Sequence, residues 1–287
     1  KNSHEYRPLG LGYANLGTGP NSSRNDVLAP QRIAGLSDIV DLRAGGVSAA
    51  ALSRGGKVYA WGGFSYAAVG EVPGVANAVA IGVDAVNTTH PHFAVLGSGA
   101  VLAWGDTSSP AARCSQSSTI PAPAVITGLS AITSVASGSG IDLFLDSAGQ
   151  AWSCGGGSDG MQGDGTAIGT NNTIAAPKPG PLRVVQGATK FVNVATGSYA
   201  SAAIAQDGSV WTWGRQSTYG LLGTGNLTAS APVLAPAKIG IDAGDPAKVQ
   251  PVYAGTQSAA GTDGTSTVDV GVMFAPEHWS KAGQGYL

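Results

Sequence analysis

The only closely spaced pair of histidines in this chain is His90-Pro-His92. Alternate residues of a strand point to the same side, so the two rings would share one face if the segment is extended. A zinc site needs at least a third protein ligand, and the sequence places no other Cys, His or carboxylate beside this pair. A ligand contact by His90 and His92 and a solvated start of a strand both stay open.

Asp159 and Asp164 stand among glycines, but their spacing lacks the alternating ligands and the closing Glu of a calcium loop. A Gly-x-Ser-x-Gly turn occurs only in broken form at Gly138-Ser-Gly140, without the strand-to-helix setting of a nucleophilic serine. Gly155-Gly-Gly157 is not followed by the Lys-Ser or Lys-Thr of a phosphate-binding loop. We therefore expect no metal site, no cofactor and no enzymatic activity.

The clearest pattern is a repeated corner, a short strand that ends in Trp-Gly. Good copies are Val58-Tyr-Ala-Trp-Gly62 and Val210-Trp-Thr-Trp-Gly214, and a Gly-containing turn precedes each. Five corner positions recur at intervals of 43 to 59 residues: Trp61, Trp104, Cys154, Trp213 and, in a degenerate copy, Val270. This period suits one propeller blade per repeat. The corner Trp side chains are expected to be buried packing groups.

Each corner strand follows two earlier strands in its repeat, and the middle strand is rich in small residues, as in Ser48–Leu52. The spacing predicts an all-β propeller of about five to seven four-stranded blades. Small residues on the middle strand are expected to lie near the common axis, where bulk would clash. The segments 65–73, 107–123, 158–181 and 216–236 are long polar loops, the usual carriers of function on such a scaffold.

The sequences Val58–Gly62, Tyr219-Gly-Leu-Leu-Gly-Thr-Gly225, Met161–Thr166 and Asn15-Leu-Gly-Thr-Gly19 carry a resemblance. They resemble the regulator of chromosome condensation repeat family, in a bacterial secreted or surface form. The resemblance implies a β-propeller, usually of seven blades. It places repeats at residues 1–271 and leaves 272–287 as a tail or as the start of a sixth repeat.

Composition limits the partners. Charged residues make up 11% of the chain, against about 25% in a typical soluble domain. The net charge is −2 and no Lys/Arg block is present, which argues against nucleic acid and against guanine-nucleotide exchange at chromatin. No apolar run reaches the roughly 18 residues of a membrane span. Few charges, few thiols and many Ser, Thr, Asn and Gly favour an extracellular or cell-surface location.

The two cysteines are Cys114, in the loop after the second corner, and Cys154, at the third corner. If successive repeats form adjacent blades, the two thiols can meet across a blade boundary. The sequence therefore predicts a disulfide between them.

The function expected from these features is a non-catalytic extracellular or surface domain that binds a protein or a neighbouring subunit, as in an appendage or adhesin. Trp279 would contact that partner, and the tail would add a strand to an exposed edge. A glycan-binding propeller is an alternative, with its candidate residues on the loops: Tyr66, Tyr219, Asn171 and Asn172. A secreted enzyme inhibitor is a third possibility.

Overall fold

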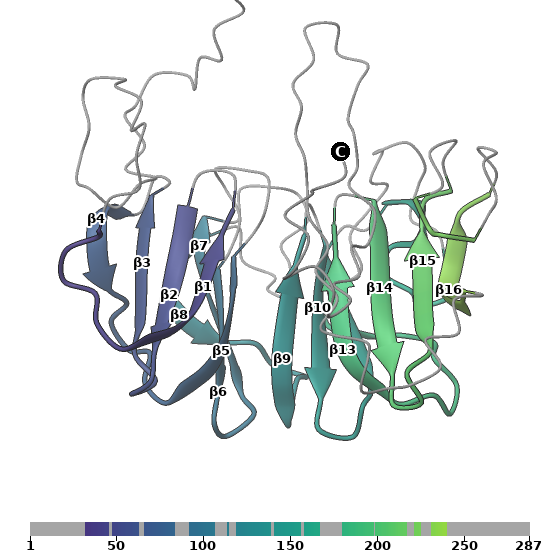
Figure 1. Cartoon of the computed structure of the whole chain (residues 1–287), viewed down its shortest axis with the longest axis horizontal. Helices are drawn as coiled ribbons and strands as arrows, with labels where there is room; N and C mark the ends of the chain where they lie inside the picture. Colours follow the sequence, from purple (N-terminus) through teal and green to yellow (C-terminus); the bar gives the residue numbers. More distant parts are fainter. Residues whose placement is uncertain are drawn as a thin grey trace, which may run out of the picture.

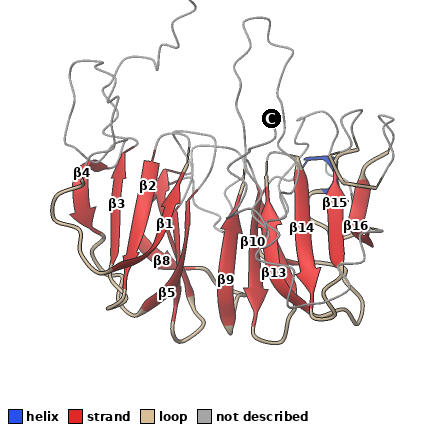
Figure 2. Cartoon of the chain, viewed as in Figure 1, coloured by secondary structure: helices blue, strands red, loops and turns tan. Residues whose placement is uncertain are grey.

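The structure is a computed structural model that describes residues 32–45, 48–62, 66–83, 92–106, 114, 119–138, 141–155, 158–166, 180–197, 199–216, 221–224 and 231–239. Within these ranges almost all regular structure is β (Figure 2). The exception is one turn of 3-10 helix, η1 (Ser158–Gly160).

Four antiparallel sheets of four strands, here called blades, follow one another along the chain (Figure 1). The first blade contains β1 (Ile39–Ala44), β2 (Ser48–Ser53), β3 (Val58–Gly62) and β4 (Tyr66–Glu71). The second contains β5 (Ala78–Val83), β6 (His92–Leu96), β7 (Val101–Asp106) and β8 (Thr119–Val125). The third contains β9 (Ile132–Ser137), β10 (Ile141–Asp146), β11 (Ala151–Gly155) and β12 (Leu182–Arg183). The fourth contains β13 (Phe191–Thr196), β14 (Ala200–Ala205), β15 (Val210–Gly214) and β16 (Val233–Lys238).

This arrangement confirms the predicted all-β propeller with four-stranded blades. Four of the five predicted corners end β3, β7, β11 and β15 of these blades. The fifth corner at Val270 and the segment 272–287 lie outside the described residues.

The innermost strands are β1, β5, β9 and β13, because each of them contacts the next one across the blade boundary. The small-residue strand of each blade is the second from the axis, next to the innermost strand. Ala49, Ala50 and Ala51 belong to β2, the second strand of its blade, and all three are buried. Ala50 packs towards the second blade and Ala49 and Ala51 towards the opposite side. Small side chains are needed there because both faces of the strand are covered.

The core consists of apolar layers between successive blades. One layer holds Leu52, Val58 and Ala60 of the first blade against Ile81 and Trp104 of the second. The next two layers join the second blade to the third and the third to the fourth. Alternate residues of each strand face opposite neighbours, so every middle strand contributes to two layers.

Backbone hydrogen bonds also cross the blade boundaries at the hairpin turns. The carbonyl of the turn glycine accepts from the first inner residue of the next blade, with N···O distances of 3.0 Å (Ala78 to Gly56), 3.0 Å (Ile132 to Gly99) and 2.9 Å (Phe191 to Gly149). The hairpin turn of one blade thus fixes the position of the following inner strand.

Short linkers between blades share a pattern of two apolar residues around a two-residue turn that contains Gly, which was not among the sequence predictions. Val72-Pro-Gly-Val75 and Ile126-Thr-Gly-Leu129 insert their two apolar residues into the layer between neighbouring blades. Ile33-Ala-Gly-Leu36 packs near Trp61 in the same manner. After the third blade this place holds a buried polar network, in which Gln186 accepts from Ala151 N (2.8 Å) and donates to Gly149 O (2.7 Å).

Candidate functional site

The corner residues occupy one position in each of the four described blades, and Trp104, Cys154 and Trp213 face the preceding blade. Opposite each corner, the neighbouring strand contributes a second residue to the same face, because the two are paired in register: Ala49 with Trp61, His92 with Trp104, Asp142 with Cys154 and Ser201 with Trp213. We call these pairs the junction positions. We call the end of the blades where β3, β7, β11 and β15 end the corner face.

Between the third and fourth blades, the junction is a hydrogen-bonded contact with a loop. Trp213 Nε1 donates to Met161 O at 2.8 Å, and Ser201 Oγ donates to the same carbonyl at 3.1 Å. Gly163 lies under the indole ring, and a Cβ there would come within 2.7 Å of Trp213 Nε1. Only glycine allows the loop to approach the ring so closely, since φ at Gly163 is also +69°.

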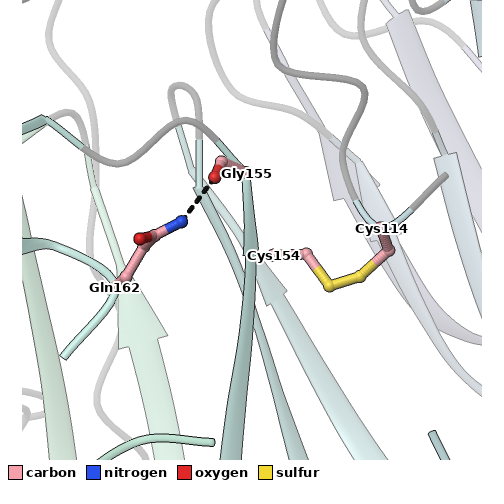
Figure 3. Close-up of a disulfide and its surroundings, with 4 residues drawn as sticks. All are labelled: Cys114, Cys154, Gly155 and Gln162. Atoms are coloured by element: carbon pink, nitrogen blue, oxygen red, sulfur yellow. Dashed lines mark hydrogen bonds between the residues drawn. A yellow bond between two sulfur atoms is a disulfide. The ribbon is translucent and has the colours of Figure 1, made fainter. Parts of the chain in front are cut away.

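Between the second and third blades, the junction is covalent. A disulfide joins Cys154, at the corner of β11, to Cys114, so the predicted pair is formed (Figure 3). Cys154 is fully buried and Cys114 is half-buried against the same apolar layer. Asp142, paired with Cys154 in register, is fully buried as well. Next to the disulfide, Gln162 Nε2 donates to Gly155 O at 2.6 Å.

Between the first and second blades, the junction is aromatic. His92 stacks on Trp104 with ring centroids 5.7 Å apart and an interplanar angle of 24°. His92 is 6% exposed, so the expectation of a solvated strand start is wrong for this residue. The expectation failed because register, which puts His92 opposite a corner Trp, is not visible in a single strand's sequence.

The corner Trp residues are buried as predicted: Trp61, Trp104 and Trp213 are each at most 3% exposed. Trp152 and Trp211, two residues earlier, pack into the same layers as Cys154 and Trp213. The indoles of the two half-buried Trp residues bind local side chains, Asp146 Oδ2 at 3.0 Å and Ser209 Oγ at 2.9 Å.

The described loops of the corner face are bound firmly to the blades. Gly165 N donates to Leu234 O of β16 (3.0 Å), and Val185 N donates to Gly163 O (2.8 Å). In the fourth blade, Thr212 Oγ1 donates to Leu222 O at 2.7 Å. The guanidinium of Arg215 lies 4.9 Å from the ring centroid of Tyr199. These contacts give the corner face a rigid base.

Most of the predicted binding residues fall outside the described part of the chain: His90, Tyr219, Asn171, Asn172 and Trp279. Tyr66 begins β4. Sequence reasoning missed Ser201 and Met161. The repeat alignment could have found Ser201, because the residue opposite each corner lies 12 residues before it, as Ala49 does before Trp61 and His92 before Trp104.

Asp164 Oδ1 accepts from Thr166 N at 3.1 Å and from Thr166 Oγ1 at 2.8 Å, as in a polar turn. Among the described residues, no group of three or more Cys, His, Asp or Glu side chains is placed to hold a metal ion. The same part of the chain has no helix with the length and apolarity to cross a membrane.

Comparison with known proteins supports the repeat assignment. Residues 191–221 and 207–261 match the Regulator of chromosome condensation (RCC1) repeat. Among solved structures, human WBSCR16 is similar in fold, with a TM-score of 0.64 and 17% identity over 84% of this chain and 63% of that chain.

Two structures of Prp20, the RCC1 protein of Saccharomyces cerevisiae, are also similar in fold. Yeast RCC1 (Prp20), solved with bound Kap60, gives a TM-score of 0.58 at 22% identity, covering 76% of this chain and 52% of that chain. Prp20p, described with its binding properties to Gsp1p and histones, gives 0.56 at 22% identity, covering 76% and 54%. The chain thus spans 52–63% of the length of these three structures. Its four-stranded blades, its repeat match at residues 191–261 and its likeness in fold to yeast RCC1 make the chain an RCC1-like β-propeller.

Proposed function

We propose that this propeller is a non-catalytic protein-binding domain that acts outside the cell or at its surface. The observation that carries the binding role is the RCC1-like fold itself, because the yeast protein with this fold is seen with bound Kap60. Binding through a propeller face needs rigid loops and no reactive group. The corner face provides such loops, since Gly165, Val185 and Leu222 join them to blades through hydrogen bonds.

The extracellular part of the proposal rests on the disulfide. A disulfide that links a half-buried loop cysteine to a fully buried strand cysteine persists in oxidising compartments and is rare in the cytosol. The low charged fraction, 11%, and the absence of a basic block agree with this location. At this location, the partner is a protein or a neighbouring subunit of a surface assembly.

The binding face can be tested by site-specific photocrosslinking. A photoreactive residue replaces Thr224, which is exposed in a loop of the corner face, and in a control it replaces Ser98, which is exposed in a hairpin turn at the opposite end. Both proteins are incubated with the surface fraction and the culture medium of the source organism. We expect a discrete crosslinked protein from position 224 and none from position 98.

The expected product must also disappear when excess unlabelled propeller competes. Equal labelling from both positions, or labelling that competitor leaves unchanged, would contradict a corner-face binding site. A glycan array with the same protein tests the alternative function, glycan binding. Saturable glycan binding without a protein crosslink would replace this proposal with the lectin function.

A further inference from the structure

The disulfide stands where a neighbouring blade uses a hydrogen bond. Cys154 and Trp213 are equivalent corner residues, and each faces the preceding blade. Trp213 fixes its neighbour through Met161 O, and Cys154 fixes its neighbour through Cys114. The same junction is therefore non-covalent in one place and dependent on the redox state in the other.

We propose that the Cys114–Cys154 disulfide is a redox switch of the junction between the second and third blades, which is closed by oxidation and loosened by reduction. The inference goes beyond the proposed binding function and its test uses no partner. The proposal predicts that the two blades become fixed to each other at the corner end of this junction only after the chain reaches an oxidising compartment.

The surroundings define how the bond would be exchanged. Cys114 is half-buried and Cys154 is fully buried, so an external thiol reaches the sulfur of Cys114 first. A dithiol reductant attacks that sulfur, forms a mixed disulfide with Cys114 and releases the Cys154 sulfur as a thiolate, which takes a proton. The second thiol of the reductant then displaces Cys114. Two electrons and two protons pass from the dithiol to the protein, and the reductant leaves as its own disulfide.

Two features keep the rest of the junction in place after reduction. The apolar layer between these blades holds Phe93, Val95, Ile132 and Phe144 in addition to Cys154, and Phe93 and Phe144 meet edge to face with ring centroids 5.4 Å apart. The hydrogen bond from Ile132 N to Gly99 O, 3.0 Å long, crosses the same boundary at the opposite end. Reduction should therefore loosen the corner end and leave the blades folded.

Hydrogen exchange measured by mass spectrometry tests the switch. With dithiothreitol under native conditions, we expect exchange to rise about tenfold in peptides that carry Cys114, the start of β10 and the end of β11. In peptides that carry Met161, Ser201 and Trp213, the exchange rate should change less than about twofold. Oxidised glutathione should restore the exchange pattern of the untreated protein. Brief treatment with glutathione should leave the mixed disulfide on Cys114.

The matched variants are Cys114→Ser/Cys154→Ser and Trp213→Phe. The double variant should show the reduced pattern with and without dithiothreitol, and Trp213→Phe should loosen the neighbouring junction in a way that reductant does not alter. If the double variant does not fold, Cys114→Ala alone keeps the buried Cys154 and serves in its place. Faster exchange throughout the chain on reduction would overturn the switch, as would no change at the corner end or a glutathione adduct on Cys154.

Discussion

At the residue scale, one position of the repeat carries three different chemistries. The junction residues stack in the second blade, form a disulfide in the third and donate hydrogen bonds in the fourth. All of these side chains are buried. Among the described residues Trp104 Nε1 has no hydrogen-bond partner, whereas Trp213 Nε1 donates to Met161 O. The requirement at this position is contact with the preceding blade, and residue type is free to vary as long as that contact is made.

Trp213→Phe should reveal the energetic contribution of the hydrogen-bonded junction. The change removes the 2.8 Å bond from Nε1 to Met161 O in a fully buried place, while Phe retains most of the packing. We expect the free energy of unfolding to fall by about 1–3 kcal/mol, measured by urea denaturation at unchanged m-value.

The control for that measurement is Trp211→Phe, which removes a similar bond to Ser209 Oγ from a half-buried indole. Water can replace that partner, so the loss should stay below about 1 kcal/mol. Equal losses in the two variants would show that ring size, and not the junction bond, accounts for the effect.

Asp207 provides a prediction about pH. The hydroxyl of Ser209 and then its backbone N–H hydrogen-bond the carboxylate, and they lower the pKa of Asp207 below its ordinary value. A lowered folded-state pKa gives stability that is present above the unfolded pKa and is lost as the pH falls through the folded value. Carboxyl-carbon NMR titration should place the midpoint of Asp207 below that of a free Asp.

Ser209→Ala is the matched variant, because it removes the larger cause and keeps the backbone donor. The pKa of Asp207 should then rise towards its ordinary value without reaching it. An unchanged midpoint would mean that the hydroxyl does not hold the carboxylate.

At the element scale, the hairpin turns set the spacing between blades. Gly99 and Gly74 have the same φ, +81°, but a Cβ on Gly99 would lie 2.6 Å from Ala131 Cα, whereas a Cβ on Gly74 would meet nothing within 4 Å. Gly74→Ala should therefore cost only the left-handed backbone strain, about 1–2 kcal/mol. Gly99→Ala must also push the third blade away and should cost at least about 1 kcal/mol more.

Thermal unfolding of both variants against the parent protein checks this difference. A larger loss for Gly74→Ala would contradict the role of the turn as the spacer between blades.

The strands themselves could be predicted from sequence, because each turn glycine and each Trp-Gly corner mark a strand end. The order of the strands within a blade, from axis to rim, could not be predicted from sequence. The alanines of β2 are equally consistent with a strand beside the axis and with a strand buried between two neighbouring blades. The disulfide followed from the repeat phase of Cys114 and Cys154. The burial of His92 and the shared acceptor Met161 O depended on contacts between blades, which a single strand's pattern does not contain.

At the scale of the whole molecule, the blades form a row in which each packs on the next. Stability in such a row is close to a sum of blade and junction contributions. The three described junctions differ in chemistry, so the molecule should loosen locally at one junction before it unfolds as a whole. The redox switch proposed for the second junction depends on this independence.

The far side of the fourth blade supports a prediction about chain length. Strand alternation turns Ile204 and Val210 away from the third blade, because their neighbours Ala203 and Trp211 pack into the layer with it. Both residues are nonetheless buried, at 4% and 1% exposed. The RCC1 repeat match continues to residue 261, 22 residues past Ile239. We therefore expect a chain that ends at Ile239 to expose this face. Its free energy of unfolding should fall by about 3 kcal/mol or more, at roughly 1.5–3 kcal/mol for each large apolar side chain.

A chain that ends at Gly271 should keep the stability of the full protein, since it retains every predicted repeat. Urea denaturation of the two truncated chains beside the full chain decides the matter, and equal stability of the chain ending at Ile239 would show that the repeats beyond it do not contribute to the fold.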